Sequence, residues 1–369
     1  MIISWNTTYE CNLACRHCYR DAGAKRENEL STYEGKNLLK EIALSGFKIV
    51  IFSGGEPLLR EDIYELIAFA KGLGIRPVLG TNGTLITRDV ARRLKEAGAE
   101  RIGISLDSID PELCDDFRQK KGVYDVVIEG IENLKGVGLG FQIHTTVMDF
   151  NEQDLEKITE MAVSLGASAH HIFFVLPVGR AKKSYEDAFK IITRRQGEND
   201  EGILNSMLKE SVTKPTLVMF EGDFVSEDKI LAQGYEKILQ RILRKQKEVE
   251  IELRPICAPQ FVRIAKEMGL EMRFTKGCLA GISYCCILPQ GELYPCPYLP
   301  LEVGNIRERR FSDLWRDSEV FHRLRSMDYT GRCGRCDYKS ICGGCRARAF
   351  LKSNDYLAED PGCFFNTSV

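Results

Sequence analysis

The chain has 369 residues, of which 44% are hydrophobic and 28% charged, and its formal net charge is −2. This composition is ordinary for a globular protein of two or three domains, and the near-neutral charge gives no basis for binding nucleic acid or an anionic membrane surface. No apolar run approaches the length of a bilayer span and the N-terminus lacks the pattern of a signal peptide, so a cytoplasmic protein with no membrane partner is expected.

From residue 2 to about residue 178, short β-branched runs alternate with amphipathic helical stretches. This alternation is typical of β/α units that build a parallel sheet. The predicted strands are 2–7, 48–52, 76–80, 101–106, 140–147 and 169–175, with helices near 32–45, 61–73, 87–97, 123–136 and 152–165. Six units fall short of the eight that close a TIM barrel, so we expect an α/β fold, a partial (β/α)6 TIM-type barrel with functional groups at the carboxyl ends of its strands.

Three thiols, Cys11, Cys15 and Cys18, directly follow the first predicted strand. A cubane 4Fe-4S cluster has four iron corners, so three cysteine thiolates hold it and leave one iron open for another molecule. Two other readings remain. The same spacing would place the sulfurs on one helical face in an apolar core, and His17 or Asp21 could complete a zinc site. The charged neighbours and the spacing favour the open cluster.

The second predicted strand is followed by Gly54, Gly55, Glu56 and Pro57. Paired glycines let the backbone approach a ligand closely, and the carboxylate of Glu56 is an acceptor for an ammonium group. The alternative is a plain strand-to-helix turn with Pro57 in the first helical turn. The position of this run, one β/α unit after the three thiols, favours a ligand site.

Polar residues also follow the third and fourth predicted strands. Asn82 begins an Asn-Gly step, which by itself indicates only a turn. Ser105 ends the fourth strand, where its hydroxyl could meet a ribose hydroxyl or a carboxylate. Arg118, about a dozen residues further on, is either a carboxylate-binding group or a solvated arginine at a helix end.

The fifth predicted strand alternates so that Gln142, His144 and Thr146 share one face. Both faces of a parallel sheet are normally buried, so a polar face indicates a lined lumen and makes His144 a candidate catalytic residue. Adjacent strand residues point in opposite directions, so only one of His170 and His171 can face this lumen. A lone strand histidine is more often a structural group than a ligand.

Residues 180–250 are rich in Lys, Arg and Glu with helical spacing near 234–247, which predicts a helical bridge without readable chemistry. Cys257 follows, between Pro255 and Pro259, and two prolines exclude a helix interior there. Cys257 is a candidate catalytic residue as a cluster or haem-iron thiolate or a proton donor. A buried, inert thiol is the alternative.

Nine of the fourteen cysteines lie between residues 278 and 363. Thiols in this number in a reducing compartment indicate metal sites rather than disulfides. Eight of them would complete two four-cysteine clusters. Zinc ribbons built from paired CxxC motifs are the alternative.

The CxxxCxxC run of Cys11, Cys15 and Cys18, with His17 in the usual aromatic position and Gly54–Gly55–Glu56 after it, resembles the radical SAM superfamily. The resemblance implies that S-adenosylmethionine chelates the open iron and that an electron from the cluster cleaves it to a 5'-deoxyadenosyl radical. It also implies a set of residues that bind this cofactor: His17, Gly54, Gly55, Glu56, Asn82, Ser105 and Arg118.

The C-terminal cysteines resemble the SPASM extension of radical SAM maturases, which holds auxiliary 4Fe-4S clusters. The resemblance implies two ligand sets: Cys278, Cys285, Cys296 and Cys345 for the first, and Cys333, Cys336, Cys342 and Cys363 for the second. Cys286 is an extra thiol that this pattern does not assign. The expected organisation is therefore a barrel over 1–180, a bridge over 181–270 and a cysteine-rich SPASM domain over 271–369.

Several stretches resemble the haem-biosynthesis branch of the superfamily: 4–8, 18–23, 141–151, 257–261, 277–281 and 343–348. The resemblance is greatest to enzymes that remove two acetate side chains from 12,18-didecarboxysirohaem to give iron-coproporphyrin III. It implies an iron tetrapyrrole substrate, with His144, His170 or Cys257 near the iron and Arg180 or Arg346 near the carboxylates. It also implies a low-potential electron donor such as ferredoxin or flavodoxin.

Three other readings remain open. Sibling enzymes modify side chains in haem d1 synthesis or decarboxylate propionates oxidatively, and peptide maturases share the same layout. Sulfatase maturases carry an aspartate base where this chain has Pro297, which argues against deprotonation of a peptide cysteine or serine. An electron carrier or zinc scaffold would leave the Glu56 motif and the polar strand face without a purpose.

Overall fold

The computed structural model describes residues 1–148, 150–182 and 225–365 of the chain. The strands of these residues form one sheet in the order β10-β9-β8-β1-β2-β3-β4-β5-β6-β7. Their bounds are β1 Ile2–Asn6, β2 Ile49–Ser53, β3 Arg76–Thr81, β4 Arg101–Ser105, β5 Phe141–Val147, β6 Ala169–Phe174, β7 Glu252–Ile256, β8 Tyr284–Ile287, β9 Glu292–Tyr294 and β10 Gly304–Asn305.

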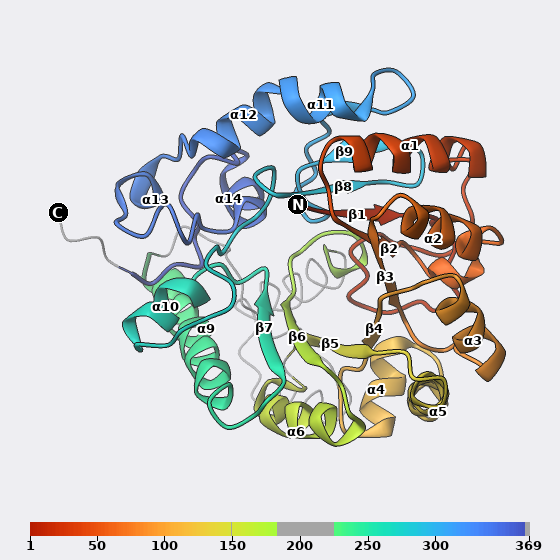
Figure 1. The fold of residues 1–369 in the computed structure, drawn as a ribbon. Helices are drawn as coiled ribbons and strands as arrows, with labels where there is room; N and C mark the ends of the chain where they lie inside the picture. The colour runs from red at the N-terminus through yellow and green to blue at the C-terminus, as the bar shows by residue number, and fades with distance from the viewer. Residues whose placement is uncertain (149, 183–224, 366–369) are drawn as a thin grey trace, which may run out of the picture.

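Strands β1 to β7 are parallel and curve around a central space, with helices on the outside (Figure 1). The predicted open α/β barrel is therefore confirmed. The α-helices of the described chain are α1 Thr32–Leu44, α2 Ile63–Gly72, α3 Arg88–Glu96, α4 Pro111–Arg118, α5 Val123–Gly136, α6 Leu155–Leu165, α9 Val225–Lys245, α10 Phe261–Glu267, α11 Phe311–Asp317, α12 Glu319–Ser326, α13 Gly331–Arg335 and α14 Arg346–Ser353. Short 3-10 helices lie at Pro57–Leu59 and Glu152–Asp154.

Helix α1 shows how local sequence sets these elements. The Ser31 hydroxyl accepts the Glu34 N–H, and the Glu34 carboxylate accepts the Ser31 N–H at 2.8 Å, which makes a capping box. The helix buries Leu38, Leu39 and Ile42 against the sheet. One side of each outer helix thus covers the outer face of the sheet, and the inner face of the sheet lines a central space.

Strand β7 differs from the sequence-based expectation, because it lies inside the predicted helical bridge. Pro255 lies within it, and a proline is tolerated there because β7 is the last strand of the sheet and has a free edge. The bridge prediction falls in part on residues 183–224, which lie outside the described residues. The described part of the bridge contains α9, β7 and α10.

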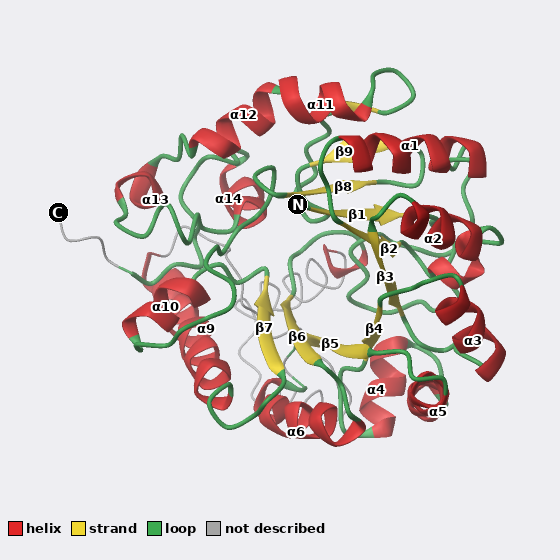
Figure 2. Cartoon of the chain, in the orientation of Figure 1, coloured by secondary structure: helices red, strands yellow, loops and turns green. Residues whose placement is uncertain are grey.

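The C-terminal part continues the barrel sheet. Strand β8 pairs in parallel with β1, so that Cys286 lies opposite Ser4, and β9 and β10 extend the sheet in antiparallel fashion. Beyond β10 this region consists of short helices joined by long loops (Figure 2). Among the described residues, no helix combines the length and the apolarity that a bilayer crossing needs.

Candidate functional site

A cavity of about 400 Å³ lies inside the barrel and extends to the C-terminal part of the chain. Strands β1 to β7 contribute inward-facing residues to its wall, and the loops of the C-terminal part contribute the rest. Two groups of thiols line it: Cys11, Cys15 and Cys18 in the first, and Cys257, Cys278, Cys296 and Cys345 in the second. The cavity volume is typical of a small-molecule site.

Each sulfur of the first group accepts a hydrogen bond. Asn82 Nδ2 lies 3.9 Å from Cys11 Sγ, Arg118 Nη1 lies 3.8 Å from Cys15 Sγ, and a backbone N–H lies 3.5 Å from Cys18 Sγ. Such donors stabilise a thiolate, which is the form of cysteine that ligates iron. Burial raises the pKa of the Cys11 thiol to about 11, so its deprotonation goes together with metal binding.

Two buried polar atoms beside this group have no hydrogen-bond partner among the described residues, namely His17 Nδ1 and Arg118 Nε. His17 stacks on Phe117 with ring centroids 4.4 Å apart, and burial lowers the pKa of its imidazole, which is therefore neutral. Arg118 forms a buried ion pair with Asp107. Both His17 and Arg118 line the cavity, and unpaired buried polar atoms of this kind fit a polar, carboxylate-bearing ligand such as S-adenosylmethionine.

Gly54 and Gly55 line the cavity where their loop runs against the backbone of residues 8–10. A Cβ on Gly54 would lie 2.5 Å from Thr8 O, and one on Gly55 would lie 2.2 Å from Glu10 O. Gly54 also has φ 144°, which side chains rarely allow. Only glycine fits at these two positions, and the exposed backbone of the loop faces the cavity.

Glu56 does not face the cavity, which differs from its predicted role as an ammonium acceptor. Its carboxylate is fully buried and accepts the Thr81 hydroxyl at 2.8 and 2.9 Å and the Asn82 N–H at 2.8 Å. Burial raises the pKa of Glu56 to about 7. The residue therefore ties the glycine loop to the end of β3. This leaves backbone groups of Gly54 and Gly55 to meet the ligand.

Strands β5 and β6 place a polar surface on the cavity wall. Gln142, His144 and Thr146 all line it, as the alternation of the sequence predicts, and His171 joins them. The Gln142 amide nitrogen lies 2.7 Å from His144 Nε2 and 3.3 Å from His171 Nδ1. The two imidazoles stack with centroids 5.2 Å apart.

His170 lies on the opposite face of β6, outside the cavity. It is fully buried and its ring nitrogens lie 3.0 Å from the Thr159 hydroxyl and 2.9 Å from the Thr145 hydroxyl. The suggestion that His170 lies near a substrate iron is therefore not supported. His171 lines the cavity instead of His170, because neighbouring strand residues point to opposite faces of the sheet.

The second thiol group differs by one member from the predicted ligand set. Cys257, Cys278, Cys296 and Cys345 all line the cavity, and each interacts electrostatically with the other three. Cys285 instead lies in the apolar core, fully buried on the outer face of β8. The structure thus brings Cys257, and not Cys285, together with the other three sulfurs.

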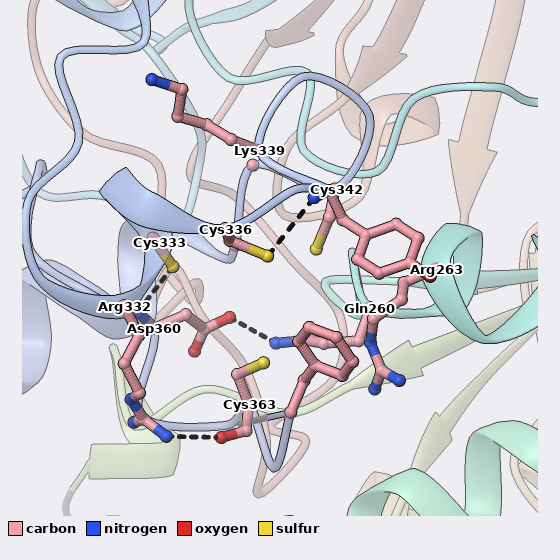
Figure 3. Close-up of a pocket in the computed structure, with 13 residues that line it drawn as sticks. Gln260, Arg263, Arg332, Cys333, Cys336, Lys339, Cys342, Asp360 and Cys363 are labelled. Atoms are coloured by element: carbon pink, nitrogen blue, oxygen red, sulfur yellow. Dashed lines mark hydrogen bonds between the residues drawn. The ribbon is translucent and has the colours of Figure 1, made fainter. Parts of the chain in front are cut away.

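The remaining predicted ligands, Cys333, Cys336, Cys342 and Cys363, line a second cavity of about 30 Å³. Their sulfurs turn toward a common space (Figure 3). The Asp360 N–H donates to Cys333 Sγ at 3.3 Å, and a second backbone N–H donates to Cys336 Sγ at 3.4 Å. Four half-buried thiols, two of which accept such donors, fit a fully coordinated iron-sulfur cluster.

Across the described residues, no three His, Cys, Asp or Glu side chains meet at the distances of a single metal ion.

Four arginines line the main cavity, whereas no Asp or Glu of the described residues does. Arg180 and Arg346, the predicted carboxylate partners, already bind the protein. Arg180 donates to Ala22 O at 2.6 Å, and Arg346 donates to Ala358 O at 2.7 Å. Arg254 was missed with its strand β7, although the alternation of residues 252–256 carried a signal for it.

Comparisons with known proteins give matching families and relatives. The Radical SAM superfamily model matches residues 5–162, and the model of the SPASM iron-sulfur cluster-binding domain matches residues 278–346. The AdoMet-dependent heme synthase of Methanosarcina barkeri is 37% identical over 99% of this chain and 96% of its own length. That of Oleidesulfovibrio alaskensis is 38% identical over 99% and 87%. The Fe-coproporphyrin III synthase of M. barkeri is 30% identical over 98% and 87%.

Two solved structures share the fold. Streptococcus suis SuiB bound to S-adenosylmethionine has a TM-score of 0.65 at 17% identity, covering 99% of this chain and 76% of its own. Native anSMEcpe with bound AdoMet has a TM-score of 0.67 at 17% identity, covering 98% and 93%. At this identity the likeness concerns the fold alone.

Proposed function

Since this chain belongs to the radical SAM superfamily and carries a SPASM domain, we propose that it modifies carboxylate side chains of an iron tetrapyrrole in haem biosynthesis. One observation carries the proposal: both thiol groups and four arginines border the same cavity, whose described lining holds no acidic residue. A polycarboxylate substrate complements such a wall electrostatically. The full-length relatives named heme synthase and Fe-coproporphyrin III synthase support this substrate class.

In this proposal Cys11, Cys15 and Cys18 hold the cluster that S-adenosylmethionine completes. When bound, the pair supplies a 5'-deoxyadenosyl radical. Arg118 Nε and the Ser105 hydroxyl bind polar groups of the methionine or ribose part, His17 supports the cofactor beside the cluster, and the Gly54–Gly55 backbone accepts its ammonium group. Asn82 holds the cluster edge through its contact with Cys11.

The favoured reaction is oxidative decarboxylation of propionate side chains. The radical that the bound cofactor would supply would take a hydrogen atom from the substrate carbon, carbon dioxide would leave as a vinyl group forms, and one electron would have to be taken up. The second thiol group borders the same cavity, so an auxiliary cluster there is the proposed acceptor. The identities of 37% and 38% to heme synthases, against 30% to the Fe-coproporphyrin III synthase, favour this reaction.

The second candidate is the removal of acetate side chains from 12,18-didecarboxysirohaem. The full-length match to the Fe-coproporphyrin III synthase favours it, because that name gives the product expected from the sequence. In either reaction a low-potential donor such as ferredoxin or flavodoxin is proposed to supply the electron that cleaves S-adenosylmethionine. Neutral His144 on the wall is proposed to contact the macrocycle.

Both reactions are tested in one anaerobic experiment. The reconstituted protein is incubated with reductant, S-adenosylmethionine and either iron-coproporphyrin III or 12,18-didecarboxysirohaem, and products are analysed by mass spectrometry. Vinyl products support the first reaction, and stepwise acetate loss supports the second. 5'-Deoxyadenosine formed while both tetrapyrroles stay unchanged would contradict the substrate but keep the radical chemistry. Cys15→Ala is the control that should abolish all products.

A further inference from the structure

A row of polar residues crosses four neighbouring strands on the cavity wall. Ser105 on β4 pairs in register with His144 on β5, His144 pairs with His171 on β6, and His171 pairs with Arg254 on β7. All four side chains line the cavity. Because register partners lie side by side across a sheet, these groups form one continuous surface.

Hydrogen bonding within this surface leaves one ring N–H of each of the two histidines able to donate to a ligand. The Gln142 amide nitrogen lies between His144 Nε2 and His171 Nδ1, so both of these ring nitrogens act as acceptors. Each neutral ring then carries its proton on the other nitrogen, His144 on Nδ1 and His171 on Nε2. Burial lowers the pKa of His144 to about 4 and that of His171 well below its usual value, so both stay neutral near pH 7.

Arg254 ends the row at the edge strand of the barrel. Its guanidinium stacks on the Phe274 ring at 3.5 Å from the centroid, but makes no hydrogen bond or ion pair with any described residue. Burial lowers the pKa of Arg254 and outweighs the opposing effect of the Glu252 charge, which forms no ion pair with Arg254. It differs in this from Arg180 and Arg346, whose groups are bound to backbone carbonyls.

The opposite end of the row lies toward the cofactor. Burial is the main reason for the lowered pKa values of His144 and His171, and the positive charges of Arg118 and Arg254 act in the same direction on His144 and His171 respectively. Arg118 contacts Cys15, and Arg254 lies beside His171 in the strand register. A flat ligand on this row would therefore bring a carboxylate to Arg254, while Arg118 remains with the cofactor.

We propose that Arg254, with the His171 ring beside it, binds one carboxylate side chain of the substrate and thereby fixes which part of the macrocycle reaches the cofactor. The inference rests on the proposed function, since it assumes a polycarboxylate tetrapyrrole. A guanidinium stacked on an aromatic ring keeps its N–H fork free for a bidentate carboxylate contact. Arg254 is in these terms a specificity-determining residue of the cavity.

The test compares binding of iron-coproporphyrin III with that of its tetramethyl ester, followed by absorbance changes of the tetrapyrrole on titration with reconstituted protein. We expect Arg254→Gln to weaken binding of the tetra-acid by about tenfold or more, because a charge-assisted pair is lost. Binding of the ester, which has no carboxylate to lose, should be equal in the two proteins. The matched control is Arg76→Gln, at an exposed arginine that begins β3 outside the cavity.

The outcomes separate the inference from the function on which it rests. If wild-type protein binds the tetra-acid and Arg254→Gln binds it equally well, the role of Arg254 is wrong while the function stands. An equal loss for acid and ester would point to a damaged cavity and also overturn it. If wild-type protein binds neither compound, the tetrapyrrole function falls and the inference falls with it. Unchanged affinity for S-adenosylmethionine in the variant confirms that the cofactor site is intact.

Discussion

At Cys257 the backbone conformation bears directly on the chemical role of the side chain. It adopts φ 61°, in the left-handed region that costs a residue with a side chain roughly 1–2 kcal/mol. The thiol is thereby turned to Cys278, Cys296 and Cys345 on the cavity wall. Strain of this kind persists where the surrounding structure and a function require it. A ligand role explains the conformation better than a role as a buried thiol.

Exchange of Cys257 and of Cys285 for alanine distinguishes the two possible ligand sets. Cys257→Ala should lower the iron content by about four per chain, because one cubane loses a ligand. Cys285→Ala should keep the iron and lose only about 1 kcal/mol of stability, since it removes one buried sulfur from the core. Anaerobic iron and sulfide analysis measures both. Iron retained in the first variant and lost in the second would restore the ligand set predicted from the sequence.

The residue scale also shows what the sequence can and cannot predict. Spacing alone identified the first thiol group and the polar face of β5, because both depend on short-range geometry. The choice between Cys257 and Cys285 depends on which sulfur reaches three others from distant loops. No local pattern contains that information. The direction of the Glu56 side chain is a similar case, because its carboxylate oxygens accept hydrogen bonds from Thr81 and Asn82 at the end of the next strand.

At the scale of elements, a glycine on the inner face of β4 makes room for a side chain that lines the cavity. Gly103 on β4 lies under the His144 imidazole, and a Cβ there would be 2.3 Å from its Cε1 atom. Gly103→Ala should therefore displace the ring and lower tetrapyrrole affinity about tenfold, with S-adenosylmethionine affinity unchanged. Gly140→Ala is the control, because a Cβ there meets nothing within 4 Å. Titrations of both ligands measure this, and equal tetrapyrrole affinity in both variants would contradict the packing role of Gly103.

The alternation of β6 predicts a pH effect for its outward-facing histidine. Burial lowers the pKa of His170 to about 3, below the usual 6.5, so the folded state holds a neutral ring that the unfolded chain protonates first. Its contribution to stability is present above pH 6.5 and is lost as the pH falls toward 3. His170→Gln should reduce the loss of unfolding free energy between pH 7 and pH 5 by about 2 kcal/mol. Urea titrations at both pH values measure it, and a pH dependence equal to that of wild type would show the prediction to be wrong.

Element prediction succeeded where strands and helices alternate regularly along the chain and failed at β7, which follows the long polar segment. The six predicted barrel strands are present as β1 to β6. Strand β7 has five residues and includes Pro255, which usually marks a break. Strand β7 pairs with β6, which lies far before it in the sequence. This tertiary contact outweighs the local tendency of the proline to break a strand. The missed strand is also the one that carries Arg254.

At the scale of the whole molecule, the chain joins two cluster-binding regions through one buried ion pair. The Asp360 carboxylate accepts two hydrogen bonds from Arg348 at 2.9 Å, one from Gln260 at 2.7 Å and one from the Cys345 N–H at 2.6 Å. Arg348 also donates to the carbonyl of Cys257 at 2.7 Å. The ion pair thus links the loop after β7 to the last cysteine-rich segment.

Asp360→Asn tests whether this link supports both auxiliary sites. Burial acts to raise the pKa of Asp360, but pairing with Arg348 outweighs it and the pKa falls to about 2, so the carboxylate is charged in the folded protein. The amide would remove that charge from buried Arg348 and lower the unfolding free energy by about 3–5 kcal/mol. Iron should be lost from both sites, because the Asp360 carboxylate binds the Cys345 N–H and also fixes the segment whose own backbone N–H donates to Cys333 Sγ.

The neighbouring Glu359→Gln is the matched control for this link. Glu359 is 40% exposed in its side chain and pairs with Arg332 at the surface, so its loss should cost less than about 1 kcal/mol and leave the iron content unchanged. Urea denaturation followed by circular dichroism, with iron analysis of the folded protein, measures both variants. Asp360→Asn protein with full iron and wild-type stability would mean that the two cluster regions hold together without the ion pair. Loss of iron from only the site of Cys333 would restrict its role to the C-terminal cavity.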